Sequence, residues 1–213
     1  MISKKKLCAD WRLYVITTGP WGTQLIENAR QAVAGGADAL QLRDKDLDDR
    51  ALVEAARALL EVTRPAGVPL IINDRPQVAR DAGADGVHLG QEDGPLAPVR
   101  KLLGPSVLIG RSTHTPEQGA AAQAEGFDYI GVGPVFATPT KPDYPPAGLS
   151  YVRWASENLT VPFVAIGGID RSNVSRVLEA GARAVAVVRA VMGSDHPRES
   201  AAKIKEVVHG YRS

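Results

Sequence analysis

The fold of this chain can be worked out from Ala82-Gly83-Ala84-Asp85-Gly86-Val87-His88-Leu89, where a helical pattern (76–82) gives way to a short apolar run (86–89). A glycine at such a junction can adopt the left-handed conformation that ends a helix and turns the chain back toward a strand. Related junctions occur at 34–38, 125–128 and 180–183. The chain is therefore expected to repeat one strand–helix unit.

Eight apolar runs alternate with eight helical patterns from one end of the sequence to the other. The predicted strands are 13–17, 39–42, 70–73, 86–89, 107–110, 129–132, 163–166 and 184–188. The predicted helices are 23–34, 48–63, 76–82, 95–103, 116–125, 150–158, 172–180 and 197–211. Nearly continuous apolar runs are typical of parallel strands that are buried on both faces. Eight such units in 213 residues predict an α/β protein with one (β/α)8 TIM-barrel domain over 1–213.

Composition and charge narrow the function classes. The net charge is +1 with histidine neutral, which gives no electrostatic reason to expect nucleic acid or an anionic membrane as a partner. Cys8 is the only cysteine, so neither a disulfide framework nor a cysteine-rich metal site is expected. No run approaches the roughly 18 apolar residues of a membrane span. We expect a cytoplasmic protein.

Polar residues follow the predicted strands, at the barrel end where active sites form. Those we expect to share one site are Gln41, Arg43, Lys45, Asn73, Asp74, Asp93, Ser112, Thr138, Thr140, Lys141 and Arg189. His114 is a candidate acid or base, or equally a wall residue, because its ordinary pKa lies near neutrality. For His88, inside an apolar run, a structural role is expected.

Carboxylates and cations occur together in this set. Asp74 and Asp93 follow neighbouring strands, and Mg²⁺ takes one or two protein carboxylates together with water and substrate phosphates. Arg43, Lys45 and Lys141 supply the positive charge that a diphosphate requires. The combination predicts a metal-bound diphosphate, and the alternative is a set of salt bridges closing the barrel mouth.

A second anion site is predicted at the last two strands, 163–166 and 184–188. Gly167-Gly168 and the segment 189–192 occupy the usual phosphate position of TIM barrels, where backbone N–H groups bind the anion. The long loop 133–149, which follows strand 129–132, holds Thr138, Thr140 and Lys141 among prolines, a combination that suits a phosphate or pyrophosphate. It is interpreted as an anion-binding lid, with an inert proline-rich surface loop as the alternative.

Seven motifs in this sequence resemble those of a known protein family. LYVIT (13–17), QLRDK (41–45), INDR (72–75), GADGVHLGQED (83–93), STHT (112–115), GPVFATPTK (133–141) and AIGGI (165–169) resemble those of the thiamine-phosphate synthase family, in order across 13–192. The resemblance implies a Mg²⁺-dependent transferase that joins a hydroxymethylpyrimidine diphosphate to a thiazole phosphate and releases pyrophosphate. It is also compatible with a homo-oligomer.

The resemblance also implies residue roles. The diphosphate would be bound by Arg43, Lys45, Asn73 and Lys141, and Mg²⁺ by Asp74 and Asp93. The pyrimidine diphosphate would also face Ser112, and the thiazole phosphate would contact Thr138, Thr140, Gly168 and Arg189. The implied mechanism is dissociative: the C–O bond breaks before the thiazole nitrogen attacks. Catalysis would then depend on stabilising the leaving group, chiefly through Lys141, Arg43 and Ser112.

Three positions depart from the family pattern: Thr18, Arg111 and Arg189. The last two add positive charge, which would either strengthen phosphate binding or obstruct a substrate. The second candidate function is that of the related thiazole tautomerase, which uses a histidine. Arg111 and His114 match its pattern and leave this alternative open. A non-catalytic phosphate-binding regulator is a third alternative, but it has no need for Asp74 and Asp93 together.

Overall fold

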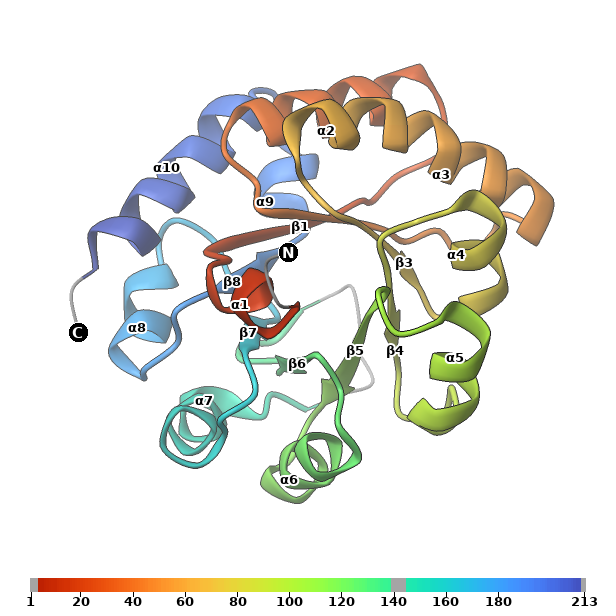
Figure 1. The fold of residues 1–213 in the computed structure, drawn as a ribbon. Coiled ribbons are helices and arrows are strands. Elements are labelled where there is room, and N and C mark those ends of the chain that lie inside the picture. The colour runs from red at the N-terminus through yellow and green to blue at the C-terminus, as the bar shows by residue number, and fades with distance from the viewer. Residues whose placement is uncertain (1–3, 139–144, 212–213) are drawn as a thin grey trace.

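Eight parallel strands close into a barrel in which each strand pairs with its sequence neighbours and β1 pairs with β8 (Figure 1). The computed structural model describes residues 4–138 and 145–211. The strands are β1 (Leu13–Ile16), β2 (Ala39–Leu42), β3 (Leu70–Asn73), β4 (Gly86–Leu89), β5 (Leu108–Thr113), β6 (Tyr129–Val132), β7 (Phe163–Ile166) and β8 (Val185–Val187). The predicted (β/α)8 fold class is confirmed.

Helices surround this barrel. They are α2 (Thr23–Ala34), α3 (Asp49–Thr63), α4 (Pro76–Ala82), α5 (Leu96–Leu103), α6 (Pro116–Glu125), α7 (Gly148–Asn158), α8 (Val174–Glu179) and α10 (Pro197–Gly210). Three short helices accompany them: α1 (Lys4–Ala9), η1 (Arg64–Ala66) and α9 (Arg189–Met192). Neither α1 nor η1 is predicted from the sequence, since both are too short to show a hydrophobic period.

Two boundary differences have clear causes. Strand β5 runs to Thr113 rather than 110, because Ser112 and Thr113 continue the pairing with Gly131 and Val132 of β6. Ser112 is therefore held inside a strand. Helix α3 begins one residue later than predicted, because the Asp48 side chain accepts a hydrogen bond from the Ala51 N–H and caps the helix.

The glycine junctions behave as predicted. Gly83 ends α4 with φ 69° and Gly126 ends α6 with φ 94°, both in the left-handed region. A residue with a Cβ is strained there, so glycine lets each helix stop and the chain re-enter the barrel.

Large side chains fill the end of the barrel interior at which the strands begin. Trp11, Tyr14 and Tyr129 are all buried, and the Trp11 ring meets the two tyrosine rings edge-on at centroid distances of 5.5 and 5.0 Å. Burying each such side chain contributes about 1.5–3 kcal/mol. In Figure 1 helix α1 lies across the centre of the barrel, next to this cluster. Room for a ligand is left at the other end, where the strands finish.

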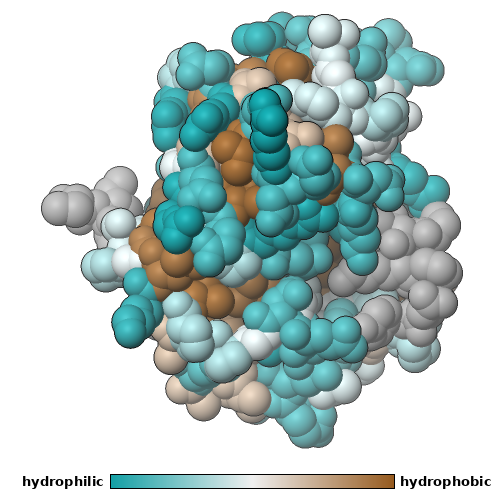
Figure 2. Space-filling model, turned by 90° about the vertical axis from the view of Figure 1, so that its right-hand side faces the viewer, coloured by the Kyte–Doolittle hydropathy of each residue, from teal (hydrophilic) through white to brown (hydrophobic). Residues whose placement is uncertain are grey.

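The outer surface is largely polar on the face that Figure 2 shows, where hydrophilic residues surround smaller hydrophobic areas. Across residues 4–138 and 145–211, no helix has both the length and the apolar character needed to cross a membrane.

Candidate active site

A cavity of about 320 Å³ opens at the carboxyl ends of the strands. This volume suits a small-molecule ligand. Seven of the sequence-predicted site residues line it: Gln41, Arg43, Asn73, Ser112, Thr138, Gly168 and Arg189. The strand-end rule thus brings together side chains that are up to 148 residues apart in sequence, from Gln41 to Arg189.

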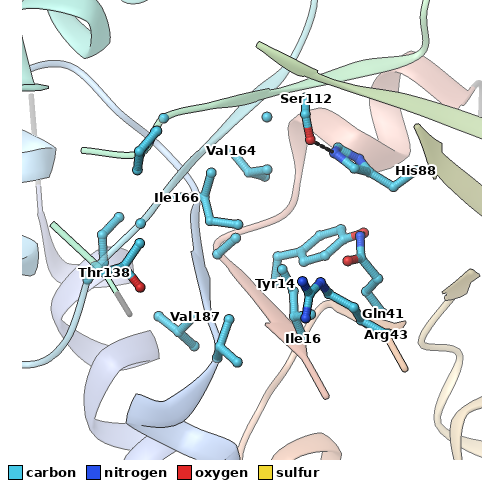
Figure 3. A pocket seen from close by; sticks show the side chains of 18 of the residues that line it. Tyr14, Ile16, Gln41, Arg43, His88, Ser112, Thr138, Val164, Ile166 and Val187 are labelled. Carbon is cyan, nitrogen blue, oxygen red and sulfur yellow. Dashed lines mark hydrogen bonds between the residues drawn. The ribbon is translucent and has the colours of Figure 1, made fainter. Parts of the chain in front are cut away.

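One wall of the cavity is polar. Figure 3 shows Gln41, Arg43, His88 and Ser112 on the same side of the pocket, with Val164 and Ile166 between them and Thr138. The Arg43 backbone N–H donates to the buried Thr17 Oγ1 at 3.0 Å, which fixes the chain as it leaves β2. The Arg43 guanidinium, carried on this fixed backbone, can bind the two oxygens of a phosphate group at once.

Two predicted metal ligands meet beside this wall. A Cβ built on Gly90 would lie 3.1 Å from Asp93 Oδ2 and 3.9 Å from Asp74 Oδ1, so both carboxylates face one small space. Asp93 Oδ2 also accepts the Gly90 N–H at 2.5 Å. Asp74 has φ 61°, a left-handed conformation that aspartate tolerates better than most residues. The donor set therefore fits Mg²⁺, which needs only one or two carboxylates from the protein.

Some predicted residues do not line the cavity. Asp74 and Asp93 lie beside it rather than in its wall, and Lys45 is exposed in the loop between β2 and α3. Thr140 and Lys141 lie outside the described residues, so their roles stay predictions. Among the residues that the structure does describe, no group of three or more His, Cys, Asp or Glu side chains could hold a metal ion.

The opposite wall is built from glycine and backbone. Gly167 and Gly168 have φ 107° and 63°, and the start of the long loop packs directly on them. The Val135 N–H donates to the Ile166 carbonyl at 2.8 Å, and the Phe136 N–H donates to the Gly167 carbonyl at 3.0 Å. A Cβ on Gly168 would stand 2.8 Å from the Ala137 carbonyl oxygen. These contacts bring Thr138 to the mouth beside the glycine pair.

Several lining residues are missed by sequence reasoning. Tyr14, Ile16, Val164, Ile166 and Val187 form the floor and apolar side of the pocket. Every residue of β1 is buried, so the sequence carries no alternation that separates Tyr14, which points into the barrel, from its neighbours. Burial raises the pKa of the Tyr14 hydroxyl, which stays protonated at neutral pH.

The histidines and Arg111 have distinct positions. His88 is buried yet lines the cavity, and its Nε2 lies 2.9 Å from Ser112 Oγ. His114 also lines it, with Nδ1 2.6 Å from the Gly133 carbonyl oxygen, so this nitrogen is the donor. Arg111 points elsewhere: its guanidinium donates to the carbonyls of Gly94 and Gln91. Arg111 therefore braces the loop that carries Asp93 and does not obstruct the pocket.

The ion-pair alternative for the mouth is not supported at two of its residues. In the part of the chain that the structure describes, neither Arg43 nor Asp93 forms a salt bridge. Arg75, which follows β3, instead pairs with Asp49 at 3.0 Å and donates to the Leu47 carbonyl at 2.7 Å, on the helix side of the strand.

Known proteins resemble this chain over most of its length. Residues 13–191 match the family model described as thiamine monophosphate synthase. A thiamine-phosphate synthase from Thermus thermophilus is 46% identical, over 93% of this chain and 98% of the relative. One from Gloeobacter violaceus is 50% identical over 90% of this chain, which spans only 55% of that longer relative.

A solved structure of a related enzyme also resembles this chain. The thiamine phosphate pyrophosphorylase from Pyrococcus furiosus superposes with a TM-score of 0.87 at 35% identity, covering 95% of this chain and 98% of that one. The family model, the relatives and the solved structure agree, and the chain belongs to the thiamine monophosphate synthase family of transferase enzymes.

Proposed function

We propose that this chain couples 4-amino-2-methyl-5-(hydroxymethyl)pyrimidine diphosphate to 4-methyl-5-(2-phosphooxyethyl)thiazole, giving thiamine phosphate and pyrophosphate with Mg²⁺ as the metal. The observation that carries the proposal is the two-sided cavity. Arg43 and Ser112 line one wall beside the Asp74–Asp93 carboxylates, and Thr138 and Gly168 line the other.

The diphosphate is assigned to the polar wall. Arg43 and Asn73 line the cavity there and offer N–H donors to phosphate oxygens. Asp74 and Asp93 would hold the metal, which when bound neutralises charge on the diphosphate. Lys45 and Lys141 are proposed as further diphosphate ligands from the family resemblance.

The thiazole phosphate is assigned to the opposite wall. Thr138, Gly168 and Arg189 line the cavity there, and the resemblance proposes Thr140 as a fourth contact. Gly167 and Gly168 line the cavity without side chains, so it is their backbone that a ligand would contact there. Arg189, one of the departures from the family pattern, is exposed at the mouth and would add charge for the phosphate.

The residues present suit a reaction by leaving-group departure. The bond between the pyrimidine methylene carbon and the diphosphate oxygen breaks, and its electron pair leaves with pyrophosphate. The thiazole nitrogen lone pair then forms the new C–N bond. Arg43, Ser112 and Lys141 would stabilise the departing charge, while Ile16, Val164 and Ile166 keep the space between the two walls apolar.

The direct test supplies both purified substrates with Mg²⁺ and follows pyrophosphate and thiamine phosphate. Equimolar formation of both products, lost on chelation and restored by Mg²⁺, is the expected result. Absence of thiamine phosphate from an active preparation with both substrates would contradict the proposal.

Thiazole tautomerase is the second candidate because His114 lines the cavity. Against it stand the Asp74–Asp93 pair and Arg43, for which the tautomerase reaction has no use. Isomerisation of the thiazole phosphate alone, without coupling, would favour this candidate.

The remaining expectations complete the proposal. Residues 1–213 would form one domain, located in the cytoplasm and acting on small molecules, without nucleic-acid or membrane partners. A homo-oligomer is compatible with the family.

A further inference from the structure

A chain of hydrogen bonds crosses the interior of the barrel below the pocket. Gln41 Nε2 donates to the Tyr14 hydroxyl at 2.9 Å, and the Tyr14 and Tyr129 hydroxyls lie 3.0 Å apart. The Tyr129 hydroxyl is 3.0 Å from His88 Nδ1, and His88 Nε2 is 2.9 Å from Ser112 Oγ. The chain joins strands β2, β1, β6, β4 and β5 in that order.

Tyr129 is the central link and has no place in the cavity wall. Its side chain is fully buried, whereas Tyr14, Gln41, His88 and Ser112 all line the cavity. Gly110 makes room for it, since a Cβ there would stand 2.2 Å from Tyr129 Cζ and 2.6 Å from His88 Nδ1. Any action of Tyr129 on a ligand must therefore pass through another residue.

Each hydrogen bond in this series has a defined donor and acceptor. Both phenols are protonated, because burial raises the pKa of each, so each has one proton to donate. Tyr14 accepts a hydrogen bond from Gln41, so its own proton is available for the Tyr129 oxygen 3.0 Å away. Tyr14 therefore donates to Tyr129, and Tyr129 donates to His88 Nδ1. With Nδ1 as an acceptor, a neutral His88 carries its proton on Nε2 and donates to Ser112.

The last step determines what Ser112 does. Because Ser112 Oγ accepts from His88, its own proton is turned away from the histidine. We propose that Tyr129, acting through His88, is a positioning residue that keeps the Ser112 hydroxyl a hydrogen-bond donor toward the pocket, where an anionic phosphate oxygen accepts. This inference rests on the proposed function, which puts the diphosphate against Ser112.

The substitution Tyr129→Phe removes one hydroxyl and leaves the ring. His88 Nδ1 then loses its donor, so His88 can take its proton on Nδ1 and accept from Ser112 instead. Tyr151→Phe is the matched control. Its hydroxyl is equally part of a buried contact, donating to Thr113 Oγ1 at 2.7 Å on the adjoining position of β5, but it lies outside the chain from Gln41 to Ser112.

The first measurement is the ¹⁵N NMR signature of the His88 ring in the ligand-free protein. We expect a protonated Nε2 and an unprotonated Nδ1 in the wild type and in Tyr151→Phe, and a shift toward protonated Nδ1 in Tyr129→Phe. A wild-type His88 with its proton on Nδ1 would overturn the proposal, whether or not the protein catalyses coupling.

The second measurement is a double-mutant cycle on kcat/KM for the pyrimidine diphosphate. Tyr129→Phe should lower it about tenfold, the usual worth of one hydrogen bond to a charged group, with KM for the thiazole phosphate unchanged. In a Ser112→Ala background the same substitution should have no further effect, because the hydrogen-bond relay from Tyr129 through His88 acts through Ser112. An undiminished tenfold loss in that background would overturn the proposal.

If the wild type does not couple the substrates, the proposed function fails and the relay is tested separately. The readout is then the Kd of inorganic pyrophosphate with Mg²⁺, measured by calorimetry on the wild type, Tyr129→Phe and Tyr151→Phe. Weakening of about tenfold in Tyr129→Phe, but not in Tyr151→Phe, supports the relay. Equal Kd values for these two variants would count against it.

Discussion

The two walls of the cavity differ in what lines them: mainly polar side chains on one, and mainly glycine backbone on the other. On the wall from β2 to β5, side chains face the pocket: Arg43, Asn73 and Ser112 line it, and Asp74 and Asp93 meet beside it. On the wall from β6 to β8, the backbone of Gly167 and Gly168 lies against the start of the loop that carries Thr138, and Arg189 lies at the mouth.

The difference matches the chemistry assigned to each wall. A departing diphosphate gains negative charge, which fixed cations and a metal stabilise most strongly where water is excluded. A phosphate that only anchors a substrate keeps its charge throughout the reaction, and backbone N–H groups suffice to hold it. Substitutions on the first wall should therefore affect the chemical step, and those on the second should affect thiazole binding.

The largest effect is expected at the carboxylates. Asp74→Asn and Asp93→Asn should each lower kcat by about 10³-fold or more, because each removes charge from the metal site. Asparagine also tolerates the left-handed conformation at position 74. Steady-state kinetics against Mg²⁺ concentration provide the measurement. The exposed neighbour Glu92 gives the control Glu92→Gln, and an equal loss there would point to general acidity instead.

Next in size is the loss at Arg43. Arg43→Ala should reduce kcat/KM for the pyrimidine diphosphate by about 10²-fold, the usual cost of removing one donor to developing charge. Arg43→Lys should recover only part of it, because lysine keeps the charge without the two-pronged geometry. Arg50→Ala, on a side chain that is 91% exposed, is the control. A rise confined to the thiazole KM would reverse our assignment of the walls.

Gly168→Ala tests the backbone wall. The new Cβ would meet the Ala137 carbonyl at 2.8 Å with φ at 63°, so unfolding free energy should fall by about 2–5 kcal/mol. The thiazole KM should rise about tenfold as the anchor moves, by the loss of roughly 1.4 kcal/mol.

A matched control exists at Gly67. It has φ 67° with nothing within 4 Å of a built Cβ. Gly67→Ala should cost only the conformational strain, about 1–2 kcal/mol, and leave both KM values unchanged. Chemical denaturation and substrate titrations on the two variants separate the cost of the backbone conformation from the cost of the contact with the Ala137 carbonyl. Identical kinetics for both would contradict the role of Gly168.

The smallest effect is expected at His114. His114→Ala should lower coupling less than about threefold, since it removes a contact to the Gly133 carbonyl and no group that carries the reaction. The measurement is pyrophosphate release at saturating substrates. A loss as large as that at Asp74 would reopen the tautomerase alternative.

Sequence reasoning succeeds where position along a strand is enough. Arg43, Asn73 and Ser112 follow or end apolar runs, and parallel strands of a closed barrel must finish at the same end. Gly83 and Gly126 were predictable for a related reason, because only a few residues can leave a helix through the left-handed region.

Sequence reasoning fails where the facing of a buried side chain decides the outcome. Tyr14 and Val15 are both buried, but Tyr14 packs with Trp11 and Tyr129 inside the barrel, whereas Val15 packs with the core that includes the surrounding helices. Their order in the sequence does not tell which side chain faces which way. The link from Tyr14 through Tyr129 to His88 joins residues 115 and 41 positions apart, which only the closed barrel brings together. The convergence of Asp74 and Asp93 was predicted, but not the empty Cβ position at Gly90 over which they meet.

The edge-on contacts of Trp11 have an optical consequence. Its indole touches the rings of both Tyr14 and Tyr129 at the floor of the pocket, whereas Trp154 packs against Tyr151 on helix α7. Trp11 therefore contacts two members of the hydrogen-bond chain that crosses the barrel below the pocket, and we expect its emission to change when a ligand alters that chain. A Trp11-only protein, with Trp21 and Trp154 replaced by Phe, would carry its own fluorescent reporter of pocket occupancy without an attached dye.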